Sequence, residues 1–99
     1  MSLREWFDLQ VPWSRATFGE GPRPNGVCDH IAKELDEIRK APDDLSEWVD
    51  VITLAFDGAS RAGYSYDDIV KELNRKQTVN FLRKWPAPTS EDKAVEHIK

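Results

Sequence analysis

Two apolar segments that each carry a pair of acids constrain the fold of this chain most. The segments are residues 30–38 and 45–52, and within each one two carboxylates stand three residues apart. Residues three apart share one face of an α-helix. The connection around Pro42 is too short to let two helices separate, so we expect a helical hairpin with both acid pairs on its inner side. The four acids are Glu34, Glu37, Glu47 and Asp50.

A group of carboxylates between two packed helices is unfavourable unless a cation compensates its charge. The simplest candidate is a divalent metal ion, because Mg²⁺ prefers carboxylate oxygens and leaves positions open for water and substrate phosphates. Four acids on neighbouring helices could hold one or two such ions, as carboxylate helical bundles do. A single acid pair at this spacing is usually a solvated helix face, so the hypothesis depends on there being two pairs in apolar sequence.

The composition is that of one small globular domain covering residues 1–99, of which 39% are hydrophobic. A net charge of −4 without a dominant basic stripe argues against a nucleic-acid binder. The single Cys28 fits a reducing cytosol, and no apolar run approaches the roughly 18 residues of a membrane span. We therefore expect a cytoplasmic protein with neither nucleic acid nor membrane as a partner.

Helical periodicity without any alternating strand pattern predicts an all-α bundle of about four helices. Pro12 is expected to end the first helix and Asp29 to cap the second, with an ordered loop over 13–25 between them. The helix that follows Pro42 is apolar nearly all round, so we expect a second copy of the chain to complete the core. The expected helices are 3–9, 29–40, 45–61 and 65–84, with a short one at 90–98.

A basic face is expected on the fourth helix, where three side chains follow one another at spacings of four and three. Such a face suits phosphate oxygens, although basic residues near a helix C-terminus also simply complement the helix dipole. Asp57 lies two turns after the acid pair of its helix, and we expect it to form an ion pair with a Lys or Arg. The residues of the basic face are Lys76, Asn80 and Arg83.

The expected loop over 13–25 carries Trp13 and Phe18 among glycines and prolines, just before the first acidic helix. A nucleobase could lie there while its phosphates reach the acids, which would make Trp13, Phe18 and Asn25 the border of a base pocket. The alternative, with equal weight, is that both aromatic side chains are plain core residues.

Longer stretches of the chain match a known family pattern. The match includes Glu34-x-x-Glu37 followed by Glu47-x-x-Asp50, and it extends over most of the chain from about residue 14. In this pattern the chain resembles the MazG-like all-α nucleoside triphosphate pyrophosphohydrolases, and most closely their small, often phage-borne group of dATP/dGTP diphosphohydrolases. The matching stretches are 17–23, 26–38, 42–52, 57–63 and 76–86.

The resemblance implies a helical bundle, dimeric or tetrameric, that cleaves a nucleotide between its α- and β-phosphates. It implies two or three Mg²⁺ ions, which Mn²⁺ can replace, and one acid that also positions or deprotonates the attacking water. The metal ligands and catalytic residues would be Glu34, Glu37, Glu47 and Asp50. The phosphate-binding residues would be Lys76, Asn80, Arg83 and Lys33.

The subgroup favours purine deoxynucleotides, dATP and dGTP, as substrates. A close alternative is a dGTP/GTP-selective enzyme of the MazZ type, which supplies dGMP for modified phage DNA. An alternative of a different class is a non-catalytic helical interaction module, whose acids are a solvated or partner-binding surface. Incubation with each nucleotide and Mg²⁺ separates them, because only an enzyme releases pyrophosphate.

Overall fold

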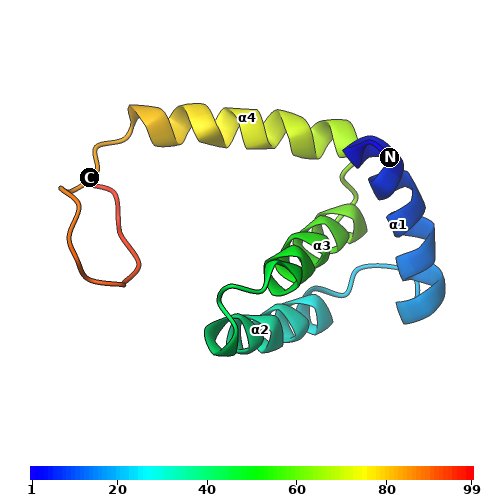
Figure 1. Ribbon diagram of the computed structural model, residues 1–99. Coiled ribbons are helices and arrows are strands. Elements are labelled where there is room, and N and C mark those ends of the chain that lie inside the picture. The colour runs from blue at the N-terminus through cyan, green and yellow to red at the C-terminus, as the bar shows by residue number, and fades with distance from the viewer. The chain divides into compact units, whose positions relative to one another are not determined.

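The computed structural model describes all residues 1–99 and contains four α-helices and no strand. The all-α class and the number of long helices predicted from the sequence are confirmed. The chain divides into two compact units, residues 1–66 and 67–99, and the site described below lies within the first unit. The helices are α1 (Leu3–Phe18), α2 (Pro24–Lys40), α3 (Leu45–Arg61) and α4 (Tyr66–Leu82) (Figure 1).

Helices α2 and α3 form the expected antiparallel hairpin (Figure 1). The Asp44 carboxylate caps α3, because it accepts hydrogen bonds from the Ser46 hydroxyl at 2.6 Å and the Ser46 backbone N–H at 3.0 Å. These bonds hold the pKa of Asp44 below its usual range. The helices approach closely at Gly58, where an added Cβ would lie 3.3 Å from Cγ1 of Val27. The hairpin therefore fixes which side chains of α2 and α3 face one another.

Helix α1 packs on α3 through aromatic rings. The Phe56 ring lies edge-on to Trp6 and Phe7, with centroid distances of 5.7 Å and 6.0 Å. Phe7 also contacts Tyr66 at a centroid distance of 5.7 Å. Phe7 and Ile38 are the only apolar residues that are buried, so one copy of the chain has a very small apolar core.

The predicted start of α1 is correct and its predicted end is wrong. Ser2 and Glu5 form the expected capping box, since each backbone N–H donates to the other's side chain at 3.2 Å and 3.1 Å. The helix nevertheless continues through Pro12 to Phe18. A proline inside a helix removes one backbone hydrogen bond and costs about 3 kcal/mol. Contacts of the later turns offset this cost, above all those of the buried Ser14 described below.

The loop expected over 13–25 shrinks to residues 19–23, so Trp13, Phe18 and Asn25 all lie on helices. Helix α2 begins at Pro24 rather than at the expected cap Asp29, because proline has the backbone angle of a first helical residue. The turn before it contains two glycines in the left-handed region, where a side chain would be strained. They are Gly19, with φ 99°, and Gly21, with φ 82°.

The helix predicted at 90–98 is absent, because so short a helix is not stable without packing. Instead the chain turns back on itself, and the Ile98 N–H donates to the Lys84 carbonyl at 2.7 Å. The Trp85 indole N–H donates to the Asn80 carbonyl at 2.8 Å, and the Trp85 ring packs on His97 with centroids 5.9 Å apart.

One face of α3 presents large apolar side chains to the exterior. Their spacing is that of a single helix face, and between 44% and 73% of each residue is exposed. A contiguous exposed apolar surface of this kind is typical of a protein–protein contact. None of the four helices has both the length and the apolar content that crossing a membrane requires. The residues of this face, called the α3 stripe below, are Leu45, Trp48, Val49 and Ile52.

Candidate metal centre

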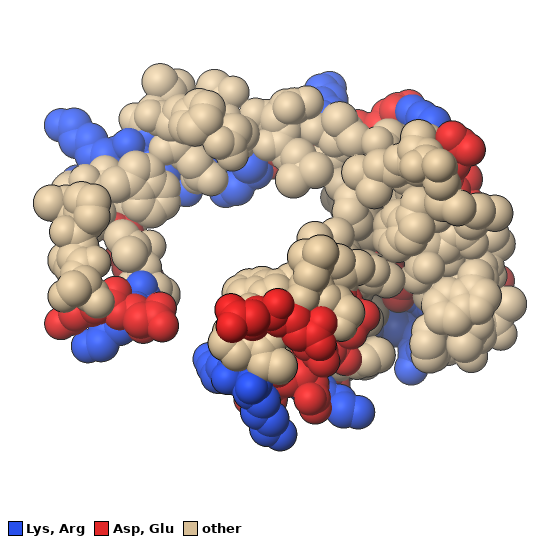
Figure 2. All heavy atoms as spheres, viewed as in Figure 1, with Lys and Arg blue, Asp and Glu red and all other residues tan.

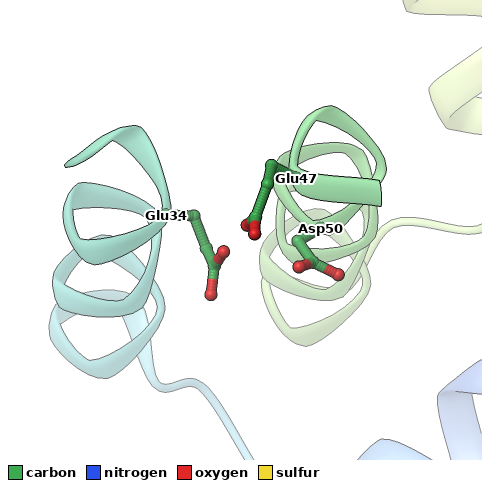
Figure 3. Close-up of side chains that lie close together, drawn as sticks. All are labelled: Glu34, Glu47 and Asp50. Atoms are coloured by element: carbon green, nitrogen blue, oxygen red, sulfur yellow. The ribbon is translucent and has the colours of Figure 1, made fainter. Parts of the chain in front are cut away.

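Three of the four predicted acids meet across the α2–α3 hairpin (Figure 3). Glu34 projects from α2, and Glu47 and Asp50 project from α3 toward it. One carboxylate oxygen of each residue lies within 4.8 Å of the other two. Glu37 lies one turn further along α2 and outside this group. The hairpin thus produces the arrangement that the paired i, i+3 spacing predicted, with Glu37 as the acid that the structure does not bring in.

The electrostatics of this group favour a cation. Partial burial raises the pKa of Glu47, and a hydrogen bond with Glu34 and the negative charges of Glu34, Asp44 and Glu37 raise it further. No Lys or Arg forms an ion pair with Glu47 or Asp50. Figure 2 shows Asp and Glu side chains gathered over the hairpin, with Lys and Arg side chains beside them. The donor set therefore fits a hard divalent cation, which would relieve this repulsion through oxygen ligands.

A pocket of about 260 Å³ opens beside the carboxylates, between α1, α2 and α3. Glu34 of α2 and Asp50 of α3 line it, and Trp13 and Phe18 of α1 form an aromatic wall. The two rings stand edge to face with centroids 5.7 Å apart. Trp13 is 55% exposed and Phe18 48% exposed, so neither is the plain core residue of the alternative interpretation.

The predicted pocket residues are only partly brought together. Trp13 and Phe18 line the pocket, but Asn25 lines neither it nor the smaller pocket of about 90 Å³ that shares Phe18. Asn25 is the second residue of α2 and is exposed. It was expected beside the aromatic residues because all three were expected in one loop, whereas in the structure they lie on helices.

Sequence reasoning missed four polar residues that line the pocket: Gln10, Ser14, His30 and Thr53. His30 Nε2 lies 3.4 Å from Oε1 of Glu34, one turn away on α2. Helical spacing could have identified His30, four residues before Glu34, and Thr53, three residues after Asp50. No sequence pattern pointed to Gln10, because Pro12 predicted that the first helix ends before this residue.

Asp57 lies at the pocket and forms the ion pair that the sequence predicted. Its Oδ2 lies 2.8 Å from Nε of Arg61, and its Oδ1 accepts a hydrogen bond from the Ser14 hydroxyl at 2.6 Å. The carboxylate is committed to these two partners and lies outside the group of three acids. Asp57 is therefore part of the pocket's framework rather than a metal ligand.

Three of the four predicted phosphate-binding residues belong to the second unit of the chain. Lys76 and Asn80 are on α4 and Arg83 directly follows it, all in the second unit of the chain. The Arg83 guanidinium donates to Asn80 Oδ1 at 3.3 Å. Lys33 is exposed on α2 and adjoins Glu34, and adjacent helical residues do not share a face. Phosphate binding by these four residues stays a prediction.

Comparison with known proteins relates nearly the whole chain to a pyrophosphohydrolase family and to a phage protein. A family model described as dATP/dGTP pyrophosphohydrolase matches residues 6–99. The Eaa protein of Salmonella phage P22 is 36% identical over 87 residues, which are 88% of this chain and 27% of that protein. This chain thus spans about a quarter of the length of that relative.

The fold is also similar to that of a solved structure. A MazG-like pyrophosphohydrolase of cyanophage S-2L, bound to dGDP and three catalytic Mn²⁺ ions per active site, matches with a TM-score of 0.78. The match covers 100% of this chain and 99% of the cyanophage chain at 24% sequence identity. The two chains thus have the same fold over their whole length.

Proposed function

This chain belongs to the dATP/dGTP pyrophosphohydrolase family, and from that premise we propose that it hydrolyses purine deoxynucleoside triphosphates to the monophosphate and pyrophosphate. The resemblance to MazG-like enzymes is confirmed in family and in fold. The observation that carries the proposal is the meeting of three carboxylates at the edge of an aromatic-walled pocket. A non-catalytic helical module needs neither feature. Residues 1–99 form one domain of this type in the proposal.

Glu34, Glu47 and Asp50 would hold the divalent cations, with Glu37 as the fourth predicted ligand. We propose Mg²⁺, two or three ions per site, with Mn²⁺ as a substitute; the cyanophage relative binds three Mn²⁺. Such ions neutralise phosphate charge and increase the acidity of a nearby water. One carboxylate of the group would orient the water that attacks the α-phosphorus and accept its proton.

The pocket beside the acids would receive the base and sugar. Trp13 and Phe18 would offer flat apolar surface to a purine, and Glu34 and Asp50, which also line the pocket, would keep the triphosphate next to the cations. The polar edge of the base would meet side chains that donate or accept hydrogen bonds, which are Gln10, His30 and Thr53. Asn25 keeps only an indirect role in this proposal, through the start of α2.

We further propose that the protein is a homodimer or homotetramer in which a second copy covers the α3 stripe. The chain buries only Phe7 and Ile38 among its apolar residues, whereas four large side chains of α3 stay exposed. Burying these side chains is the simplest source of stabilisation that one copy lacks. Nucleotide pools lie in the cytoplasm, where we place the protein, in the host cell if a phage encodes it.

The proposal is tested by incubating the protein with each of the eight common nucleoside triphosphates and Mg²⁺. Pyrophosphate release from dATP and dGTP above all others is the expected result. Release from dGTP and GTP alone would favour the MazZ-type alternative, because only a guanine-selective pocket gives that pattern. No release from any nucleotide would contradict the enzyme and leave the helical module.

A further inference from the structure

We infer that Arg61 is a positioning residue for the pocket, because its buried guanidinium fixes the segment of α1 that carries the aromatic wall and the turn that follows it. The inference rests on the proposed function, in which this pocket receives the base and sugar of the nucleotide. Arg61 does not line the pocket itself. It would act on the substrate only through the residues that it holds.

All five N–H groups of Arg61 are used. Nε donates to Asp57 Oδ2 at 2.8 Å. Nη1 donates to the carbonyls of Gly19 at 2.7 Å and Gly21 at 3.0 Å. Nη2 donates to the hydroxyl of Ser14 at 3.0 Å and to its carbonyl at 3.2 Å. Only 2% of the side chain is exposed, so water cannot easily replace any of these partners.

The side chains of Ser14, Asp57 and Arg61 form a closed hydrogen-bond network. Ser14, which is 1% exposed, donates its hydroxyl to Asp57 Oδ1 at 2.6 Å while it accepts from Arg61. Asp57 supplies the negative charge that a buried guanidinium needs. Each of the three side chains thus contacts the other two, and no side-chain N or O buried in the structure is left without a partner.

The network holds the part of α1 that follows Pro12. Pro12 interrupts the helical hydrogen bonds, and the aromatic wall follows it at Trp13 and Phe18. Arg61 donates hydrogen bonds to Ser14 near the start of this segment and to Gly19 just beyond its end. Without these hydrogen bonds, the distance of the two rings from the carboxylates on α2 and α3 would no longer be fixed.

The competing explanation is that Arg61 merely stabilises the fold. That explanation predicts a lower melting temperature and, among molecules that remain folded, an unchanged KM. A positioning role predicts instead that KM rises while kcat and metal binding stay close to wild type, because the carboxylates themselves are not moved. The separation of KM from kcat is therefore the readout that distinguishes the two explanations.

Two variants disturb these hydrogen bonds, one at the donor Arg61 and one in the turn that supplies the acceptor carbonyls. Arg61→Lys keeps the charge beside Asp57 but cannot reproduce the planar fork that reaches both glycine carbonyls. Gly21→Ala strains the turn at φ 82°, and its added methyl group meets nothing within 4 Å. The matched controls are Arg39→Lys, in an exposed pair with Asp36, and Gly63→Ala, which has the same strain at φ 102° away from the pocket.

The experiment measures kcat and KM for whichever of dATP and dGTP the wild type prefers, together with dGDP binding in Mn²⁺ and binding of Mn²⁺ alone. We expect both test variants to raise KM and the dGDP Kd by about tenfold, since a misplacement of about 1 Å can cost up to 10²-fold. Mn²⁺ binding and kcat should stay within about twofold, and both controls should match wild type.

An unchanged KM in folded Arg61→Lys and Gly21→Ala would overturn the inference and leave the proposed function intact. If Arg61→Lys does not fold, the comparison of Gly21→Ala with Gly63→Ala decides alone: equal KM values overturn the inference, and a rise in Gly21→Ala only supports it. A wild-type protein that neither hydrolyses a nucleotide nor binds dGDP would overturn the proposed function and this inference together.

Discussion

Replacing Asp57 by Asn should destabilise the protein strongly, although the two side chains have nearly the same shape. The Asn oxygen can still accept from the Ser14 hydroxyl, as Asp57 Oδ1 does at 2.6 Å. In wild type, Nε of Arg61 donates to Oδ2 of Asp57 at 2.8 Å. In the variant an amide NH₂ group would take the place of Oδ2, so two hydrogen-bond donors would face each other. The variant leaves the Arg61 charge buried without a counterion.

The size of the effect follows from Coulomb's law. Two unit charges about 4 Å apart attract by about 4 kcal/mol at an effective dielectric of about 20. Removing one partner of a buried pair costs about 3–5 kcal/mol in proteins, which agrees with this value. A small domain has only about 5–15 kcal/mol of total stability. We therefore expect the melting temperature of Asp57→Asn to fall by more than about 10 °C.

The assay is thermal and urea unfolding at one fixed protein concentration, with EDTA present so that metal binding contributes nothing. The matched control is Asp36→Asn, which breaks the pair of Asp36 with Arg39, whose side chains are 70% and 79% exposed. Exposed pairs contribute about 0–1 kcal/mol, so this control should melt like wild type. Adding Arg61→Met to Asp57→Asn should recover part of the loss, because no unpaired charge remains. Equal melting of Asp57→Asn and Asp36→Asn would refute the argument from burial.

Three further changes test other parts of the structure. Ile52→Glu places a charge in the α3 stripe and should give a monomer by sedimentation velocity; an unchanged oligomer, or a wild type that is already monomeric, contradicts the proposed interface. Asp44 has a lowered pKa, so its contribution to stability is present above the ordinary value of 3.8 and lost as the pH falls through the lower folded value. Asparagine is also a good N-cap, so Asp44→Asn should keep the cap at neutral pH but should lose this pH-dependent contribution to stability during acid unfolding. Identical acid unfolding curves for wild type and Asp44→Asn would contradict this expectation. Pro12→Ala restores a helical hydrogen bond and should stabilise α1 by up to about 3 kcal/mol in a urea melt; a loss of stability would show that the proline is needed.

The central hairpin could be predicted because its determinants are local. Apolar spacing and a connection too short for separated helices fix α2 against α3, and the predicted range 45–61 is the observed α3. Once the hairpin is fixed, acids at i, i+3 on each helix must come near one another. Glu34, Glu47 and Asp50 do so, while Glu37, one turn further along α2, lies outside the group of three.

The remainder depends on contacts between distant residues, which sequence patterns do not reveal. Pro12 is a helix-ending signal, yet α1 continues because Arg61, more than forty residues later, binds Ser14 and Gly19. Because of these hydrogen bonds, the loop expected over 13–25 becomes the end of α1 followed by a turn over 19–23. The pocket wall and the position of Gln10 follow from this extension of α1, so neither could be derived before the network was known.

The most direct test of the proposed hydrolysis at the clustered carboxylates is ³¹P NMR of dATP and dGTP incubated with Mg²⁺ and either the wild-type protein or Glu47→Gln. The exchange removes one of the three clustered carboxylates and replaces it with an amide, a poorer ligand for a hard cation. We expect monophosphate and pyrophosphate signals with wild type and Mg²⁺, and none with EDTA or with a folded Glu47→Gln. Orthophosphate as the product, turnover in EDTA, or full activity in Glu47→Gln would contradict this proposal.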